Sequence, residues 1–205
     1  MKAKTPSAGH AALAAVRVFE TTGVHRMNKL GPTFQSLFGQ FGNPIFIETG
    51  TWGGDGVFAA QLSGTFNRII SFEIDDRLYG DCKTRFANAS IIELICGDSA
   101  KLLPSLLANI NEPVTFWLDA HCSGADTGGY SRDRDRTIIG ELEAIANFEY
   151  ALDSVIIIDD VPMFGTDYSA ISLWEILCLL TKIFETPIIR THQIGRHQML
   201  VCQRG

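Results

Sequence analysis

The sequence predicts an α/β fold in which a doubly wound, mostly parallel sheet carries helices on both faces. Three observations lead to this prediction. From Ile45 onward, apolar runs of strand length alternate with segments of helical period. Several of these runs are apolar at successive positions, which is typical of strands covered on both faces. A cluster of glycines follows the first run, where a doubly wound sheet makes its first strand–helix turn.

Residues 1–44 are expected to form a tail and two helices ahead of the sheet. The first residues are small and polar, as in many loose chain termini. Ala11–Phe19 has apolar residues at helical spacing, and a second short helix is predicted around Phe34–Phe41. Residues 45–205 are expected to form one domain, because a chain of 205 residues with 46% apolar content suits a single core.

The strands and helices follow from the pattern of apolar residues. Five strands end in a carboxylate or a turn: Ile45–Thr49, Arg68–Ile74, Ile91–Gly97, Val114–Asp119 and Ser154–Asp160. Five segments have helical period: Gly56–Leu62, Arg77–Ala87, Ser99–Ile110, Thr137–Tyr150 and Ala170–Phe184. Two last apolar segments, Ile188–Gln193 and Gln198–Gln203, flank Gly195 and predict a hairpin.

Charge and cysteine content argue against several classes of protein. The formal net charge of −6 disfavours a nucleic-acid partner, because phosphate backbones are bound through clustered Lys and Arg. The five cysteines include no C-x-x-C pair, which fits neither a disulfide framework nor a zinc site and favours a cytoplasmic location. The N-terminal apolar run is broken by His10, Arg17 and Glu20, so neither a signal peptide nor a membrane contact is expected.

The stretch ETGTWGGDG, Glu48–Gly56, predicts a ligand-binding turn. Its four glycines let the backbone approach a ligand closely, and the following helix directs unpaired N–H groups toward it. The carboxylate of Glu48 disfavours a pyrophosphate and favours a positively charged ligand. Glu73, at the end of the second strand, can accept hydrogen bonds from ribose hydroxyls, and Asp98 can meet an adenine edge. A tight turn without a ligand is the alternative interpretation of the glycines.

The motifs ETGTWGG, SFEID and CGDS, in this order and spacing, resemble those of the class I S-adenosylmethionine-dependent methyltransferases. The family's first motif is closer to E-x-G-x-G-x-G, whereas here Gly50 is followed by Gly53 and Gly54. The resemblance extends from Ile45 to the end and implies a Rossmann-like, seven-stranded sheet of order 3-2-1-4-5-7-6, closed by an antiparallel hairpin. It implies the following contacts to S-adenosylmethionine: Glu48, Thr49, Gly50, Thr51, Gly53, Glu73, Ile74, Asp98, Ser99 and Asp119.

WLDAH and IIIDDV place three carboxylates, Asp119, Asp159 and Asp160, after the fourth and fifth strands. Neighbouring strands lie about 4.8 Å apart, so these side chains are expected to converge and to repel one another unless a cation neutralises them. Oxygen ligands suit Mg²⁺, Ca²⁺ or Mn²⁺. The arrangement resembles the metal site of the cation-dependent O-methyltransferases. The alternative is that the carboxylates only cap the strand ends.

His121 and Asp119 are the candidate catalytic residues. Imidazole can exchange a proton near neutral pH, which makes His121 a candidate general base, although a structural histidine is the alternative. In the catechol type of methyltransferase a lysine stands in this neighbourhood, and here there is none. The polar residues 122–136 predict a loop over the acceptor pocket, with Tyr130 as a stacking contact; a self-neutralising surface run is the alternative.

The predicted function is the transfer of a methyl group from S-adenosylmethionine to a hydroxyl of a small molecule or sugar. A divalent cation, with Mg²⁺ as first candidate, is expected to assist, and a homo-oligomer is compatible with the sequence. Two alternatives stay open. An NAD-binding Rossmann oxidoreductase is disfavoured by the missing G-x-G-x-x-G and by Glu48. A non-catalytic methyltransferase-like binding domain would have the same fold.

Overall fold

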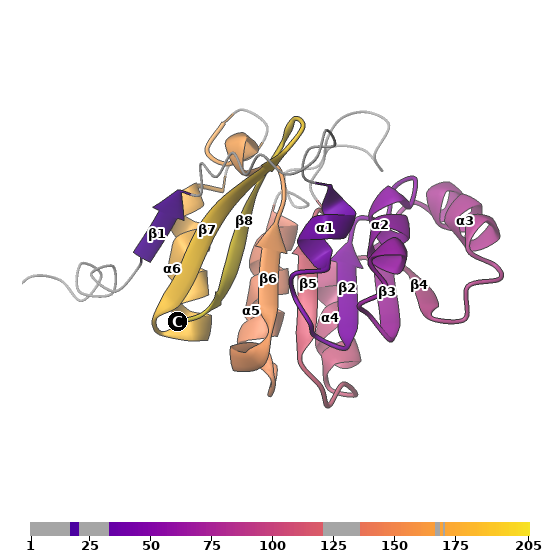
Figure 1. Ribbon diagram of the computed structural model, residues 1–205, viewed down its shortest axis with the longest axis horizontal. Helices are drawn as coiled ribbons and strands as arrows, with labels where there is room; N and C mark the ends of the chain where they lie inside the picture. The colour runs from indigo at the N-terminus through magenta and orange to yellow at the C-terminus, as the bar shows by residue number, and fades with distance from the viewer. Residues whose placement is uncertain (1–16, 21–32, 121–135, 167–168, 170) are drawn as a thin grey trace, which may run out of the picture.

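An eight-stranded sheet of order β1-β7-β8-β6-β5-β2-β3-β4 forms the centre of the molecule (Figure 1). The structure is a computed structural model that describes residues 17–20, 33–120, 136–166, 169 and 171–205. None of the helices in these ranges is long and apolar enough to cross a membrane.

The five predicted parallel strands are present with almost the predicted bounds. They are β2 (Ile45–Thr49), β3 (Arg68–Glu73), β4 (Ile92–Cys96), β5 (Val114–Leu118) and β6 (Val155–Ile158). Strand β2 pairs in parallel with β3 on one side and with β5 on the other. Every residue of β2 and β5 is buried, which explains their uninterrupted apolar pattern.

The predicted hairpin consists of β7 (Pro187–Ile194) and β8 (His197–Arg204), which pair antiparallel. Strand β8 inserts between β7 and β6 and is antiparallel to both. Counted without β1, the seven predicted strands therefore have the order 3-2-1-4-5-7-6. The predicted fold class and strand order are confirmed.

The predicted helix over Ala11–Phe19 is wrong where the structure describes it. Arg17–Glu20 forms strand β1, which pairs in parallel with β7 from Arg17↔Ile188 to Glu20↔Thr191. Helical spacing is a local signal, whereas this strand is stabilised by the open backbone edge that β7 offers from the far end of the chain. The second predicted helix is present as α1 (Phe34–Phe38), shorter than expected at its end.

Six helices in the described ranges cover the two faces of the sheet (Figure 1). One face carries α1, α2 (Asp55–Ser63) and α3 (Asp76–Arg85), and the other carries α4 (Ser99–Leu107), α5 (Thr137–Ala146) and α6 (Leu173–Phe184). Alternate residues of one strand point to different sides. In β2, Ile45 and Ile47 belong to the core under α4, α5 and α6, whereas Phe46 belongs to the core under α1 and α2.

Polar side chains determine where the helices begin. Asp75 accepts hydrogen bonds from the first backbone N–H groups of α3, and Asp98 accepts one from the N–H of Ala100 in α4. Ser172 and Glu175 form a reciprocal capping box at α6. Short 3₁₀ helices, η3 (Ala151–Asp153) and η4 (Val161–Met163), lie before and after β6. The first two of these caps place α3 and α4 directly after β3 and β4.

Candidate functional site

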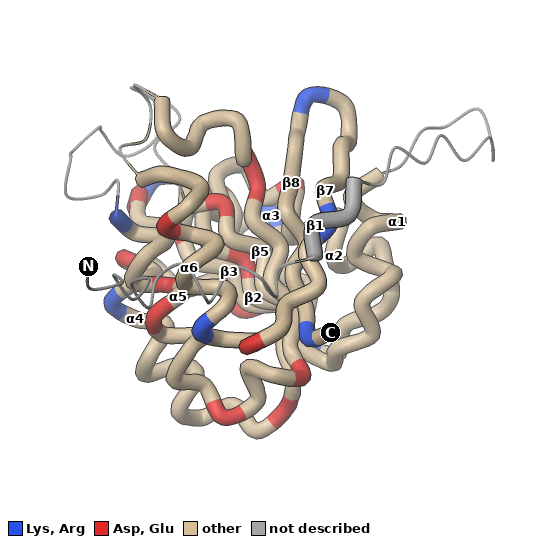
Figure 2. Tube along the Cα trace, turned by 90° about the vertical axis from the view of Figure 1, so that its left-hand side faces the viewer, with Lys and Arg blue, Asp and Glu red and all other residues tan. Residues whose placement is uncertain are grey.

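The residues that follow the parallel strands lie along one rim of the sheet. Backbone hydrogen bonds continue past the strand ends: Gly50 N–H donates to Phe72, Asp119 N–H donates to Thr49, and Asp159 N–H donates to Leu118, over 2.9–3.1 Å. Figure 2 shows Asp and Glu positions in red close to β2, β3 and β5. The expected convergence of the glycine turn and the carboxylates on one sheet edge is therefore present.

Packing restricts three glycines of the turn, Gly50, Gly54 and Gly56, whereas the fourth, Gly53, lies beside open space. Gly50 has φ +84°, and a Cβ there would lie 2.8 Å from the carbonyl oxygen of Asp119. A Cβ on Gly56 would overlap the carboxylate of Glu48 and the ring of Trp117. Gly53 has no atom within 4 Å of its Cβ position. The turn thus packs against the sheet on one side and leaves its backbone accessible at Gly53.

Glu73 joins the turn to the end of β3. Its Oε2 accepts a hydrogen bond from the backbone N–H of Trp52 at 2.7 Å, and its Oε1 accepts one from Asp75 N–H at 2.9 Å. Each carboxylate oxygen keeps a further lone pair for a ligand. Ile74, the next residue, is 45% exposed and offers apolar surface beside the carboxylate. The predicted ribose acceptor therefore lies beside the glycine turn.

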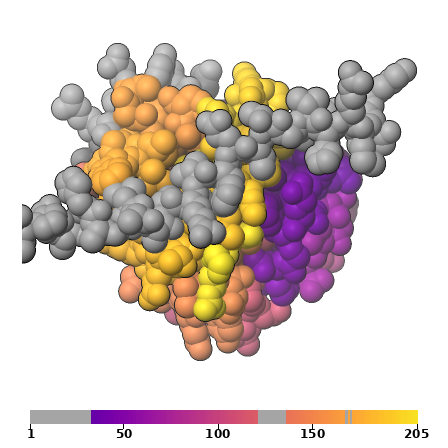
Figure 3. Space-filling model, turned by 60° about the vertical axis from the view of Figure 1, so that its left-hand side comes forward, coloured from indigo at the N-terminus to yellow at the C-terminus, as the bar shows by residue number. Residues whose placement is uncertain are grey.

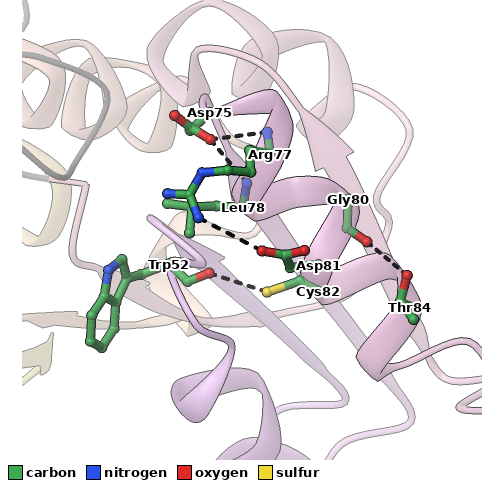
Figure 4. A network of polar contacts seen from close by, with 8 residues as sticks. All are labelled: Trp52, Asp75, Arg77, Leu78, Gly80, Asp81, Cys82 and Thr84. Atoms are coloured by element: carbon green, nitrogen blue, oxygen red, sulfur yellow. Dashed lines mark hydrogen bonds and ion pairs between the residues drawn. The ribbon is translucent and has the colours of Figure 1, made fainter.

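Helix α3 holds the turn from the outside. The thiol of Cys82 donates to the carbonyl oxygen of Trp52 at 3.2 Å, as Figure 4 shows. Arg85 donates to the carbonyl oxygen of Gly53 and, at 2.8 Å, to the carboxylate of Asp55. Trp52 has φ +45°, which is uncommon for a residue with a side chain, and its indole is 58% exposed and points away from α3. These contacts hold a strained backbone in place.

Glu48 is buried beneath the turn. The hydroxyl of Ser71 donates a short hydrogen bond to Oε2 of Glu48, and Thr51 and Ser71 share a hydrogen bond of 2.6 Å. Burial raises the pKa of Glu48 to about 8; the Ser71 hydrogen bond opposes this, and the charges of Glu73 and Asp55 add to it. The carboxyl group is therefore largely protonated at pH 7 unless a positive charge comes near.

Asp98 and Ser99 lie at the start of α4 and have partners within the protein. Asp98 caps the helix and forms an ion pair with Lys101 at 2.9 Å. The buried hydroxyl of Ser99 donates to Oε1 of Glu141 in α5 at 2.5 Å. Burial raises the pKa of Glu141 to about 7, against the opposing effect of hydrogen bonds from Ser99 and Thr49. Glu141 thus connects α5 to two predicted cofactor contacts.

Glu141 is not among the residues predicted from the sequence. A signal for it exists, because Glu141 stands three residues after Ile138 and four before Ile145, on the stripe that α5 buries. A carboxylate on such a stripe has to find buried partners.

The three predicted metal ligands lie close enough to influence one another. Burial, followed by the charges of Asp159 and Asp160, raises the pKa of Asp119 well above its usual range. Asp159 is fully buried, and its Oδ1 accepts a hydrogen bond from Asp160 N–H at 2.8 Å. Asp160 has φ +51°. The set whose donor atoms all lie within 4.8 Å of one another in the described residues is Asp159, Asp160 and His197, without Asp119.

His197, at the start of β8, is a second site residue that was not predicted from the sequence. Its Nδ1 lies 3.0 Å from Oδ2 of Asp159, and its ring meets the ring of Phe34 edge-on at 5.1 Å. In Figure 3 the surface of α1 lies directly beside that of the β7–β8 hairpin. The strand order implied by the resemblance could have indicated His197, because it places β8 next to β6 and so next to Asp159.

One candidate catalytic residue and the predicted loop cannot be placed. His121 and almost all of residues 122–136, including Tyr130, lie outside the described residues. Asp119 is described and lies two residues before His121.

No family model matches the chain, and no curated protein matches it. Solved structures do resemble it. A putative methyltransferase from Streptococcus mutans in complex with SAH matches with a TM-score of 0.58 and 12% identity over 83% of this chain and 95% of that one. The O-methyltransferase TomG from Streptomyces achromogenes, in complex with SAM, matches with a TM-score of 0.57 and 15% identity over 98% of this chain and 92% of that one. A putative rRNA methylase from Clostridium thermocellum matches with a TM-score of 0.55 and 18% identity over 83% and 95%.

These likenesses show the fold. The chain has the Rossmann-like fold of the class I S-adenosylmethionine-dependent methyltransferases, O-methyltransferases among them, with β1 added at the sheet edge.

Proposed function

We propose that this protein transfers a methyl group from S-adenosylmethionine to a hydroxyl of a small molecule or sugar, with the help of a divalent cation. One observation carries the proposal: the carboxylate of Glu73 is hydrogen-bonded to the glycine turn, on the rim that also holds Asp119 and Asp159. The neighbours TomG and the Streptococcus mutans protein, which contain SAM and SAH, support the choice of methyl donor.

The proposed donor site uses the open side of the turn. The backbone at Gly53 leaves room for a close approach, and the free lone pairs of Glu73 can accept hydrogen bonds from two ribose hydroxyls. Ile74 offers apolar surface for an adenine ring. Glu48 lies beneath the turn and would attract the sulfonium, since a positive charge near its buried carboxyl group would favour the ionised form. Asp98 and Ser99 would complete the site from the start of α4.

Methyl transfer requires a nucleophilic oxygen in line with the methyl carbon and the sulfur. As the new C–O bond forms, the C–S bond breaks, and its electron pair stays on sulfur. The hydroxyl proton has to leave the acceptor. His121 is a candidate for accepting that proton. Asp119 is the other candidate where it does not ligate the cation, because burial and the charges of Asp159 and Asp160 raise its pKa and make it a stronger base.

The carboxylates fit a divalent cation by their chemistry. Asp119, Asp159 and Asp160 bring three carboxyl groups together at one end of the sheet, and burial makes the ionised forms of Asp119 and Asp159 costly unless a positive charge lies beside them. A bound dication would lower the pKa of the acceptor hydroxyl and fix its position. The residues of this chain would hold it through carboxylate oxygens, which are suitable ligands for Mg²⁺.

A small-molecule acceptor is favoured over nucleic acid by the net charge of −6. The fold does not decide this point, since the similar Clostridium thermocellum structure is a putative rRNA methylase. A cytoplasmic location remains part of the proposal; Cys82, Cys96, Cys178 and Cys202 are all free thiols.

Calorimetry on the full chain tests the donor. We expect S-adenosylmethionine and S-adenosylhomocysteine to bind and NAD not to bind. Binding of NAD alone would favour the oxidoreductase, and binding of none would favour a non-catalytic domain. Incubation with labelled S-adenosylmethionine and a panel of catechols and sugars, with Mg²⁺ or with EDTA, then tests the acceptor and the cation.

A further inference from the structure

We infer that His197 is a ligand of the divalent cation, together with Asp159 and Asp160, and that the site therefore prefers a transition-metal dication to Mg²⁺. This inference rests on the proposed function, because it concerns the cation of the same site. The three residues are called the Asp–Asp–His group below.

The distances within the group fit a shared cation. Two donors at about 2.1 Å from an octahedral ion lie about 3.0 Å apart when adjacent and about 4.2 Å apart when opposite. Oδ2 of Asp159 and Nδ1 of His197 are 3.0 Å apart, the spacing of an adjacent pair. The donor atoms of all three residues lie within 4.8 Å of one another, so small side-chain rotations bring them to one centre.

The surrounding structure holds the donors in place. Asp159 is fully buried, and the Asp160 N–H that binds its Oδ1 leaves Oδ2 directed to His197. The ring of His197 packs edge-on against Phe34, which stacks on Trp117 at 5.0 Å. Two adjacent strands, β6 and β8, supply the backbone. A site on paired strands with a packed histidine is ordered before the ion binds.

An Asp–His hydrogen bond without a metal is the simpler use of the same geometry. It involves Asp159 and His197 only, whereas a carboxylate oxygen of Asp160 also lies within 4.8 Å of both donors. Two carboxylates and one imidazole leave the Asp–Asp–His group with a negative charge that a dication would neutralise.

The imidazole of His197 determines which dication the site binds most tightly. Mg²⁺ binds oxygen ligands and keeps several waters, whereas imidazole nitrogen suits first-row transition metals, whose affinities rise from Mn²⁺ to Co²⁺. A site of two carboxylates and one imidazole should therefore bind Co²⁺ and Mn²⁺ more tightly than Mg²⁺. A site of carboxylates alone would lack this nitrogen contribution.

Metal titrations test this on the tag-free full chain with Mg²⁺, Mn²⁺ and Co²⁺ as probes. We expect Co²⁺ to bind at least about tenfold more tightly than Mg²⁺, and the His197→Gln variant to lose most of that difference while Mg²⁺ affinity stays within about threefold. His192→Gln is the matched control, because His192 lies in the same hairpin opposite Met199 and outside the group. Unchanged Co²⁺ affinity in His197→Gln overturns the inference.

Pulsed EPR of the Mn²⁺-loaded wild-type protein gives a readout that does not depend on activity. A ¹⁴N coupling from imidazole is expected; its absence overturns the inference, as does its persistence in His197→Gln. Binding of S-adenosylhomocysteine, measured without metal, separates the two proposals. Normal binding combined with no ¹⁴N coupling rejects only the His197 ligand, whereas lack of binding rejects the proposed function.

Discussion

The backbone N–H of Trp52 donates a hydrogen bond to Oε2 of Glu73 over 2.7 Å and thereby joins the turn after β2 to the end of β3. The other oxygen of the same carboxylate accepts from Asp75, the residue that caps α3. One buried side chain thus fixes a turn, a strand end and the approach to a helix. A ligand that binds Glu73 meets a carboxylate whose orientation is already set.

The first prediction concerns this carboxylate. Glu73→Ala leaves the N–H groups of Trp52 and Asp75 without their acceptor, so we expect a loss of about 1–3 kcal/mol in the free energy of unfolding. We also expect at least about a tenfold loss of S-adenosylhomocysteine affinity by calorimetry. Glu112→Ala, on an exposed position, is the control. Unchanged affinity in Glu73→Ala would show that the ligand lies elsewhere.

The second prediction separates two glycines of the turn. In Gly56→Ala the new methyl group overlaps Glu48 and Trp117, so the free energy of unfolding should fall by about 1–3 kcal/mol. In Gly53→Ala nothing lies near the new methyl group, and stability should stay within about 0.5 kcal/mol. Gly53→Ala should nevertheless weaken S-adenosylhomocysteine binding, because the methyl group enters the ligand's space. Urea unfolding and calorimetry measure both effects; equal stability of the two variants contradicts the packing argument.

The third prediction concerns pH. The pKa of Glu141 is raised to about 7 in the folded protein, above its ordinary 4.5, so the folded state holds a proton that the unfolded chain releases. The proton bound to Glu141 stabilises the folded state by on the order of 3 kcal/mol. This stabilisation is complete below pH 4.5 and is lost as the pH rises through 7. Glu141→Gln stays neutral and should flatten the dependence of stability on pH between about 5 and 8.

Urea unfolding at several pH values checks this prediction. Glu143→Gln, an exposed position on the same helix, should keep the wild-type slope. Part of the slope should survive in Glu141→Gln, since the pKa of Glu48 is also raised, to about 8. A Glu141→Gln variant with an unaltered slope would rule out this source of the pH dependence.

The fourth prediction uses the charge difference between the two ligands. S-adenosylmethionine carries a sulfonium and S-adenosylhomocysteine a neutral thioether, so Glu48→Gln should weaken binding of the first more than of the second. Binding of the sulfonium should also release a proton from the buried carboxyl group near pH 7. Calorimetry in buffers of different ionisation enthalpy measures that proton. Equal losses for both ligands would mean that Glu48 supports the turn only through packing and hydrogen bonds.

Much of the fold could be predicted because its signals are local. The apolar runs that became β2 and β5 are buried along their whole length, and Asp75 and Asp98 stand directly before the helices they cap. The strand order came from the resemblance, not from periodicity. The position of Glu73 beside the turn followed from the local strand pattern together with the resemblance.

The missed features depend on distant parts of the chain. Strand β1 exists because Arg17 lies opposite Ile188 in a strand near the other end. In the sequence Glu141 is an acidic residue in a largely apolar helix. Its buried role depends on hydrogen bonds from Ser99 and Thr49, which the fold places beside it. His197 contacts Asp159 only because β8 inserts beside β6 in the sheet. Local patterns carry no information on such pairings.

The added strand β1 has a consequence for how copies of this protein behave in concentrated solution. It occupies the backbone edge of β7, while the opposite outer strand, β4, is short and carries Glu93 in an ion pair with Arg68 at 2.6 Å. Strand β1 is itself the outer strand at that border, but with four residues it offers a much shorter edge than the eight residues of β7. Short or charged edge strands discourage other chains from extending a sheet, so a form lacking the first twenty residues, which exposes the edge of β7, should be the more prone to precipitate.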